Sequence, residues 1–303
     1  MHLIETHFAY VFLAGRFAYK LKKPARQAGM DYRTLAARRR GCEQELRLNR
    51  RLAPAVYLAV VPLTRQHGRL RFGAPGRVVD YLVKMRRLPA SGTLDVALAR
   101  GVPTARDLGP LIELLASFYA EARPAPLGAR AYLARFDAQI GRNLRALADW
   151  PRARQIAGLQ RQFLRRAARI AGARGAHLVD AHGDLRAEHV CLEPLAVIDC
   201  LEFDRALRRL DPHEDTALLA LEIERCRPAL ARAFLRRLAA RLKDPIPASL
   251  THIYMSHRAL TRAKLAAWHL GDPQFPDPAP WLARTESYLR IAGRHVRAAL
   301  SSR

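Results

Sequence analysis

Residues 182 to 204, HGDLRAEHVCLEPLAVIDCLEFD, decide the fold of this 303-residue chain. The motifs HGD at 182–184 and VID at 197–199 each place an aspartate after a small or apolar residue, and a short turn separates them. Short apolar runs alternate here with acidic and histidine residues, which predicts loops held on short strands. Two carboxylates brought together in this way, Asp184 and Asp199, can activate a hydroxyl and hold a cation.

Helical patterns lie on both sides of this stretch. From about residue 90 onward, apolar residues recur at intervals of three and four, which is typical of helices that bury one face. The segments with this spacing are 106–121, 129–149, 152–173, 215–241, 247–269 and 280–300. The stretch with the two aspartates is therefore the exception within a mainly helical region.

The first ninety residues have a different pattern. Two β-rich runs around Gly15 predict a hairpin, and residues 34–54 have helical spacing that ends near a proline. Further strands are predicted over 56–73 and 77–89, the first of them interrupted by a turn at His67 and Gly68. We therefore expect the order ββα followed by strands.

These patterns predict an α+β protein with two lobes. The first lobe, residues 1–88, is expected to be small and β-rich, with one sheet and one helix. The second, residues 89–303, is expected to be larger, mainly helical and to carry the catalytic and metal-binding loops.

Lysine is concentrated in one strand. The chain has 52 basic residues, of which only six are lysine, and three of these fall in FAYKLKKP at 17–24. Lysine and arginine are not interchangeable where a compact charge is needed. The two-residue period of a strand places Lys20 and Lys22 on one face and Lys23 on the other. With Glu45 on the following helix, they complete a set of residues suited to phosphoryl transfer.

Four motifs in order resemble the protein-kinase-like fold, in particular its aminoglycoside and choline phosphotransferase branch. They are HGD at 182–184, Ile198-Asp199, Asp211-Pro212 and Asp215. The chain is most similar to bacterial kinase-like proteins that are often fused to a P-loop ATPase. No GxxxxGK[ST] motif occurs in this sequence. The resemblance therefore implies the kinase-like part alone, with a P-loop ATPase partner encoded separately.

The resemblance implies roles for the acidic residues and for one histidine. Asp184 would be the base that orients the acceptor hydroxyl, and His182 would support this loop. Asp199 would bind the Mg²⁺ that bridges the phosphates of ATP. Asp215 would brace the catalytic loop from the helix below it, and Glu202 would be an additional acid near the metal.

The resemblance also implies residues that bind the nucleotide. Lys22 is the preferred phosphate-binding lysine, and Lys20 is the alternative. Glu45 would be its partner on the helix, with Glu43 as the alternative. Met85 opens the segment MRRLP, where the hinge would meet the adenine of ATP through backbone groups.

The chain departs from the branch at one metal-binding position, where His189 replaces an asparagine. This change is compatible with a preference for Mn²⁺, with a single metal ion, or with a pseudokinase that binds nucleotide without turnover. The glycine-rich loop GxGxxG is also missing. A different interpretation takes His182, Asp184, His189 and Asp199 as ligands of a hydrolytic metal ion, but it leaves Lys22 and Glu45 without a role.

The net charge of the chain indicates which classes of molecule it could bind. The formal net charge is +25, which is compatible with non-specific nucleic-acid binding or with an anion-binding scaffold, although no nucleic-acid-binding motif accompanies it. Residues 215–303 contain 15 basic and 7 acidic side chains. We therefore expect a small acceptor that is neutral or anionic rather than a polycation.

The cellular location of the protein is predicted from the absence of membrane-spanning and export signals in the sequence. No apolar run approaches the roughly 20 residues of a membrane span. The four cysteines form no CxxC pair, and the first residues do not resemble an export signal. We therefore expect a cytoplasmic protein without a membrane span.

Overall fold

The computed structural model describes residues 2–27, 29–272 and 276–302. Its contacts divide the chain into two compact units. Unit 1 comprises Met1–Phe118 and His182–Arg208, and unit 2 comprises Tyr119–Ala181 and Arg209–Arg303. The stretch with the two aspartates thus belongs to the same unit as the first part of the chain. The lobe boundary at residue 88 stays a prediction.

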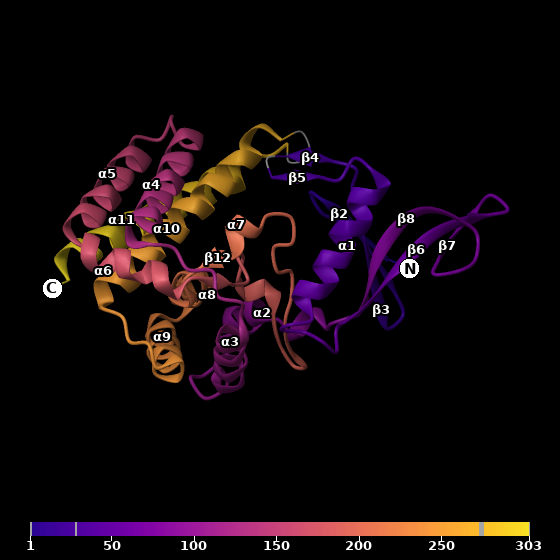
Figure 1. The fold of residues 1–303 in the computed structure, drawn as a ribbon, viewed down its shortest axis with the longest axis horizontal. Coiled ribbons are helices and arrows are strands. Elements are labelled where there is room, and N and C mark those ends of the chain that lie inside the picture. Colours follow the sequence, from indigo (N-terminus) through magenta and orange to yellow (C-terminus); the bar gives the residue numbers. More distant parts are fainter. Residues whose placement is uncertain (1, 28, 273–275, 303) are drawn as a thin grey trace. The chain divides into compact units, whose positions relative to one another are not determined.

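Unit 1 is built on a six-stranded antiparallel sheet, part of which is visible as the long ribbons β6 and β8 in Figure 1. The strand order is β1-β2-β3-β8-β6-β7. The strands are β1 (His2–Glu5), β2 (Ala9–Ala14), β3 (Phe17–Lys22), β6 (Tyr57–Gln66), β7 (Arg69–Phe72) and β8 (Arg77–Arg86). A separate short ladder joins β4 (Arg26–Gln27) to β5 (Met30–Asp31).

Both predicted turns of the sheet are confirmed. Ala14 pairs with Phe17 across a two-residue turn that begins at Gly15, whose φ is +57°. The turn between β6 and β7 contains His67 and Gly68, both with positive φ. Two-residue hairpins require such angles because their twist must match that of the strands.

The predicted helix of unit 1 is α1 (Leu35–Asn49), which begins where the Thr34 side chain accepts a hydrogen bond from the Ala37 amide. Hydroxyl groups at this position satisfy amides that the first turn leaves free. The buried face of α1 joins a core shared with β6, β8 and the two short strands β10 (Val190–Leu192) and β11 (Leu195–Val197). That core fixes the hairpin between the two aspartates of residues 182–204.

Unit 1 also contains elements that the sequence patterns did not predict. They include β1, the short helix α2 (Leu94–Ala99), the one-turn helix α7 (Arg205–Arg208) and the 3₁₀ turns Ala90–Gly92 and Ala187–His189. All four side chains of β1 are exposed, so this strand lacks the alternation that reveals a strand. The others are too short to show a helical period. The helix α3 (Gly109–Glu121) contains the boundary between the units.

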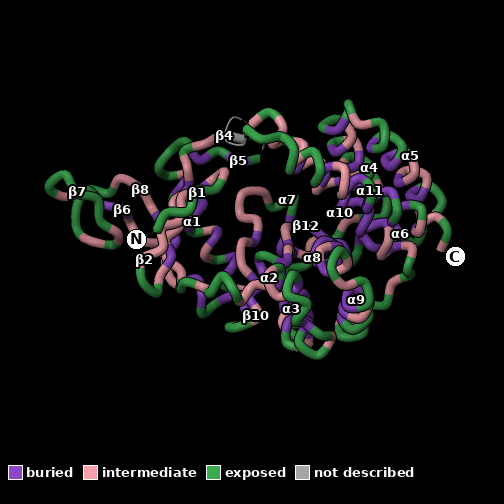
Figure 2. Tube along the Cα trace, turned by 180° about the vertical axis from the view of Figure 1, so that it is seen from behind, coloured by how far each residue is buried: buried purple, intermediate pink, exposed green. Residues whose placement is uncertain are grey.

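Unit 2 is mainly helical, and several of its helices alternate buried and exposed residues along their turns, shown in purple and green in Figure 2. They are α4 (Ala129–Ala146), α5 (Pro151–Arg166), α6 (Ala168–Ala173), α8 (Pro212–Cys226), α9 (Pro228–Leu242), α10 (Ala248–Ala267) and α11 (Ala279–Ser301). Two-residue strands, β9 (Val179–Asp180) and β12 (Arg209–Leu210), pair with each other, and 3₁₀ turns cover Arg174–His177 and Trp268–Gly271.

Two predicted helices of unit 2 are each divided. The segment 152–173 forms α5 and α6, and the segment 215–241 forms α8 and α9. The second division lies at Pro228, because proline has no amide hydrogen and disfavours a helical residue before it. Within the described ranges, no helix is long and apolar enough to cross a membrane.

Candidate functional site

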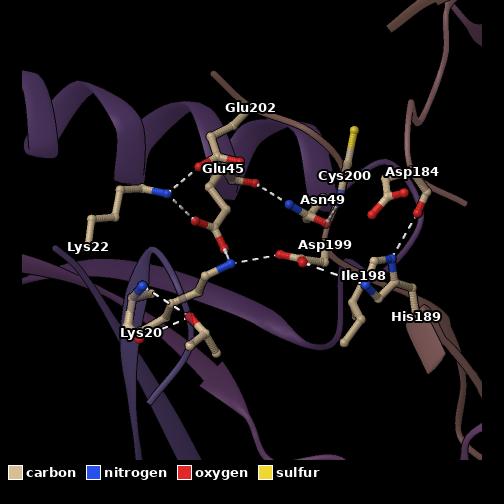
Figure 3. Close-up of polar contacts among 12 residues, drawn as sticks. Lys20, Lys22, Glu45, Asn49, Asp184, His189, Ile198, Asp199, Cys200 and Glu202 are labelled. Carbon is tan, nitrogen blue, oxygen red and sulfur yellow. Dashed lines mark hydrogen bonds and ion pairs between the residues drawn. The ribbon is translucent and has the colours of Figure 1, made fainter. Parts of the chain in front are cut away.

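Two lysines of β3 and one glutamate of α1 meet inside unit 1 (Figure 3). Lys22 Nζ lies 2.6 Å from Oε2 of Glu45, and Lys20 Nζ lies 3.0 Å from Oε1 of the same carboxylate. The two lysines share one face of the strand, as the two-residue period predicts. Each oxygen of the fully buried Glu45 carboxylate therefore has its own ammonium group.

Lys20 also joins this cluster to the second aspartate. Its Nζ donates a hydrogen bond of 2.7 Å to Oδ1 of Asp199. The Asp199 side chain is 45% exposed and that of Lys20 is 19% exposed, whereas only 3% of the Lys22 side chain is exposed. Lys20 is thus the lysine that bridges the helix glutamate and the accessible carboxylate.

The charges in this cluster stabilise one another. Burial lowers the pKa of Lys20, but Asp199 and Glu45 outweigh it and hold this pKa well above its usual value. Burial likewise opposes the charge of Lys22, and Glu45 and Glu202 overcome it and raise the pKa. Burial raises the pKa of Glu45 and of Asp199, but the lysines outweigh it and hold both below the usual range. All of these groups are therefore charged at neutral pH.

Lys22 has a second acidic partner, whose side chain is 11% exposed. Its Nζ lies 2.5 Å from Oε1 of Glu202, and the Tyr32 hydroxyl donates a 3.0 Å hydrogen bond to the same oxygen. The Lys22 ammonium lies 5.1 Å from the centre of the Tyr32 ring. A Cβ at Gly41 of α1 would lie 2.7 Å from Cε1 of Tyr32 and 3.1 Å from two carbons of Lys22. Glycine at this position lets both side chains lie against the helix.

The backbone at Asp199 is held in an uncommon conformation. Its φ is +63°, in the left-handed region that is uncommon for residues other than glycine, although aspartate and asparagine adopt it more often than most. The Asp199 amide donates to the Tyr57 hydroxyl at 3.3 Å, and the Cys200 amide donates to Oδ1 of Asn49 at 2.9 Å. The Asn49 side chain also donates to the backbone carbonyl of Glu45 at 2.9 Å. The buried side-chain amide of Asn49 therefore links the Asp199 segment to α1 by hydrogen bonds.

The HGD loop is arranged by two histidines. His182 Nε2 donates to the Ile198 carbonyl at 3.0 Å, and His182 Nδ1 accepts from the Asp184 amide at 3.3 Å. These bonds define a neutral ring with its proton on Nε2. His189 Nδ1 donates to the Asp184 carbonyl at 2.8 Å. Both histidines therefore fix the backbone on either side of the Asp184 side chain.

The second nitrogen of His189 is suited to bind a cation. Because Nδ1 donates to a carbonyl, Nε2 is the ring nitrogen left to bind a cation, and it lies 3.7 Å from Oδ2 of Asp199 and 3.8 Å from Oε1 of Glu188. A ring nitrogen whose other nitrogen donates to a carbonyl is a common metal-ligand arrangement. The donors present, an imidazole nitrogen with carboxylate oxygens, fit Mg²⁺ and suit Mn²⁺ better.

No family model matches this chain, but comparison with known sequences finds relatives. An uncharacterized protein of Mycobacterium tuberculosis and one of Mycobacterium bovis are each 33% identical to it over 306 residues. The alignments cover 96% of this chain and 59% of each relative. The chain therefore spans a little under two thirds of the length of these relatives.

Comparison with solved structures identifies the fold. An aminoglycoside phosphotransferase in complex with GDP and kanamycin has a TM-score of 0.56 and 14% identity, covering 96% of this chain and 92% of that one. A choline/ethanolamine kinase family protein from Mesorhizobium loti has a TM-score of 0.53 and 16% identity, covering 98% and 91%. This chain has a kinase-like fold. The fold is similar to that of aminoglycoside phosphotransferases, as the sequence motifs predicted, and the α+β class is confirmed.

Within the kinase-like fold, the structure brings together most of the residues singled out from the sequence. Glu43 lies outside the cluster: its side chain is 50% exposed and pairs with Arg39 on the same helix. Lys23 pairs with Glu5 on the other face of β3. Of the two acidic candidates on α1, it is therefore Glu45 that faces the lysines.

Two further candidates lie elsewhere. Met85 lies near the end of β8, opposite Ala18 of β3, and packs against the core of unit 1. Asp215 lies in unit 2, where it accepts a 2.9 Å hydrogen bond from Tyr119. The hinge role of Met85 and the bracing role of Asp215 remain predictions.

Sequence reasoning missed three residues that organise the charge cluster, namely Asn49, Tyr32 and Gly41. Asn49 lies four residues after Glu45, so it occupies the same face of α1, and this spacing is the only signal that could have revealed it. Tyr32 and Gly41 belong to no motif. Their role depends on contacts with Lys22 and Glu202, which are distant in the sequence.

Proposed function

We propose that this chain is a phosphotransferase that moves a phosphoryl group from ATP to a hydroxyl of a small molecule. The observation that carries the proposal is the position of Lys20, whose Nζ lies between Glu45 and Asp199. A lysine that is charged, partly accessible and next to a candidate metal carboxylate is suited to the phosphates of a nucleotide. Phosphotransferases with GDP bound are among the structures that share this fold.

We assign the phosphate-binding role to Lys20 rather than to Lys22, the residue favoured by the sequence. Lys20 is more exposed, and it is the one of the two that pairs with Asp199. Lys22 instead has two buried or nearly buried carboxylate partners. A phosphate could reach Lys20 by replacing one accessible carboxylate, whereas reaching Lys22 would require opening the core.

Asp199 and His189 are the residues that would hold Mg²⁺ or Mn²⁺. When bound, the cation neutralises the charge that develops on the phosphates during transfer. Asp199 supplies carboxylate oxygens, and His189 supplies Nε2 while its Nδ1 remains bonded to the Asp184 carbonyl. The partly exposed Asp199 carboxylate leaves room for such a ligand.

Asp184 is the proposed base. Its carboxylate orients the acceptor hydroxyl and receives its proton, while a bond forms between the acceptor oxygen and the γ-phosphorus. The bond from the γ-phosphorus to the bridging oxygen breaks, and ADP leaves. His182 is the supporting residue, because its two hydrogen bonds hold the loop on which Asp184 lies.

The acceptor is proposed to be neutral or anionic. The excess of basic over acidic side chains in residues 215–303 disfavours a polycation. Kanamycin is a ligand of the structurally similar phosphotransferase, and that fact concerns that protein alone. A cytoplasmic location and a P-loop ATPase partner remain predictions, as does nucleic-acid binding from the net charge.

The test measures ATP binding and phosphoryl transfer with Mg²⁺ and with Mn²⁺, using a set of neutral and anionic hydroxyl compounds. Asp184→Asn should retain ATP binding and lose at least 100-fold in turnover, because a positioned base contributes about 10²-fold or more. Asp95→Asn, an exposed change on α2 of the same unit, is the matched control. Binding of ATP without turnover under either metal would instead favour a pseudokinase, and turnover that survives Asp184→Asn would reject this base.

A further inference from the structure

Lys22 is buried more deeply than contact with a nucleotide requires. Only 3% of its side chain is exposed, and both of its ion-pair partners, Glu45 and Glu202, are among the least exposed groups of the site. A buried ammonium group is stable only where carboxylates compensate its charge. Lys22, one of only six lysines in the chain, therefore belongs to an internal ion-pair cluster with Glu45 and Glu202, next to the proposed ATP site.

The surroundings of Lys22 are shaped to hold it. Tyr32 lies under the ammonium group and donates its hydroxyl to the same oxygen of Glu202 that Lys22 contacts. Gly41 leaves space for the lysine side chain on α1, since a Cβ there would crowd both Tyr32 and Lys22. These contacts hold the Lys22 side chain against Glu45, Glu202 and Tyr32.

We propose that Lys22 is a positioning residue that holds Glu45 and residues 199–202 in place while Lys20 exchanges Asp199 for a phosphate of the nucleotide. This inference rests on the proposed function. The two lysines of β3 thereby have separate tasks: Lys20 contacts the phosphates, and Lys22 contacts only protein.

The buried negative charge of Glu45 explains why a second lysine is needed beside it. When Lys20 turns to a phosphate, its interaction with Oε1 of Glu45 weakens, and a fully buried carboxylate would lose half of its compensating charge. Lys22 remains 2.6 Å from Oε2 and keeps this carboxylate ionised. Glu45 can therefore stay in place during the exchange.

The position of Glu202 links this cluster to the metal site. Glu202 follows Asp199 by three residues, and its contact with Lys22 holds that segment from one side. Asn49 holds it from the other through the Cys200 amide. Loss of Lys22 should therefore loosen the Asp199 backbone, whose positive φ persists only where the surroundings impose it.

The first test compares Lys20→Met, Lys22→Met and the matched control Lys23→Met, whose lysine pairs with Glu5 outside the cluster, by calorimetric titration with ATP and with adenosine. Lys20→Met should weaken ATP binding by roughly 10- to 100-fold and leave adenosine binding unchanged, because a charge-assisted hydrogen bond to phosphate is lost. Lys22→Met should weaken ATP binding by a smaller factor than Lys20→Met does, because it loosens the Asp199 segment but removes no contact with a phosphate. Lys23→Met should match the parent in both.

The second test does not depend on turnover or on nucleotide. Hydrogen exchange of the amides of residues 199–202 in the free protein should be faster in Lys22→Met and in Glu202→Gln than in the parent and in Lys23→Met. Glu202→Gln keeps the shape of the side chain, so it tests the same contact if Lys22→Met fails to fold. The double variant should exchange no faster than the faster single variant, because both changes remove one contact.

The outcomes separate this inference from the proposed function. A loss specific to ATP in Lys22→Met or in Glu202→Gln, as large as in Lys20→Met, would overturn the positioning role of Lys22. Unchanged amide exchange in Glu202→Gln would overturn it as well. A parent protein that binds no nucleotide would instead reject the proposed function, and with it the exchange of partners by Lys20.

Discussion

Single side-chain contacts determine the charge cluster of unit 1. Asp199 and Lys20 face each other at 2.7 Å, and Glu45 presents one oxygen to each lysine of β3. A one-residue shift of the strand would place both lysines on the opposite face. The pairing of Lys20 with Val83 of β8 fixes this register.

Gly41 provides a prediction at this scale. Replacing it by alanine should favour the helix by about 1 kcal/mol through propensity, but the new Cβ would lie 2.7 Å from Tyr32. We expect Gly41→Ala to lower the free energy of unfolding by about 1–3 kcal/mol, since overpacking outweighs propensity. Urea denaturation measures this value.

The control for this prediction is Gly158→Ala in α5, where a Cβ would meet nothing within 4 Å. This change should raise the free energy of unfolding by about 0.5–1 kcal/mol. If both variants are stabilised equally, the close packing of Lys22 against α1 is refuted.

The identity of the site residues could be predicted only in part from the sequence. Periodicity placed Lys20 and Lys22 on one face, and the motifs indicated Asp184 and Asp199. The choice between the lysines could not be made, because it depends on which carboxylate reaches which ammonium group. That pairing is set by Glu202, a residue 180 positions from Lys22.

At the scale of elements, α1 joins the sheet to the Asp199 segment. Gly41, Glu45 and Asn49 are spaced by four residues, so they lie along one face of the helix. Gly41 lies against the side chain of Lys22, and Glu45 pairs with the ammonium groups of both lysines. Asn49 accepts a hydrogen bond from the Cys200 amide. The helix thereby carries the steric, electrostatic and hydrogen-bonding contacts of the site on one side.

The fully buried Asn49 supplies the prediction for this element. Asn49→Ala removes the acceptor of the Cys200 amide and leaves that buried group without the partner described here. We expect a loss of about 1–3 kcal/mol in the free energy of unfolding, and faster exchange of the Cys200 amide. Gln44→Ala, on the same helix but outside the cluster, serves as the control, and equal effects of the two changes would contradict this role.

Secondary-structure elements that have a strong local sequence pattern were predicted well, whereas elements without such a pattern were missed. The hairpin turns at Gly15 and at His67 follow from residues that accept positive φ. The division between α8 and α9 was missed because apolar spacing continues on both sides of Pro228. The strand β1 has no buried side chain, so only its pairing with β2 reveals it.

At the scale of the whole molecule, each unit has its own buried polar cluster. In unit 2, Arg174 bonds to the carboxylates of Asp211 and Asp244, and Tyr254 donates to Asp211. The sequence could not show that residues 182–208 belong with the first part of the chain. That association is made by core contacts, such as those of Cys191 with Tyr57 and Val83, which leave no local pattern.

Unit 2 also gives the chain a predicted dependence on pH. His257 of α10 is buried against Phe136, and burial, together with cationic side chains including Arg258, lowers its pKa to about 3. The folded pKa lies below the ordinary 6.5, so the unfolded chain binds the proton more readily. The contribution of this group is complete above pH 6.5 and is lost as the pH falls toward 3.

We therefore expect about 2 kcal/mol less stability from His257 at pH 5 than at pH 8. Urea denaturation of the parent and of His257→Leu at both values measures it. The variant should lose less stability between the two values than the parent does. An equal loss in both proteins would mean that this histidine does not contribute.

The shared carboxylate of Glu45 has a consequence for covalent chemistry. Lys20 and Lys22 are held as ammonium ions, because neighbouring carboxylates keep the pKa of each above its usual value. An ammonium ion has no lone pair and cannot act as a nucleophile. Acylating and aldehyde reagents aimed at these two amines must therefore break an ion pair before a bond can form, so the lysines at the centre of the site are among the hardest in this chain to label.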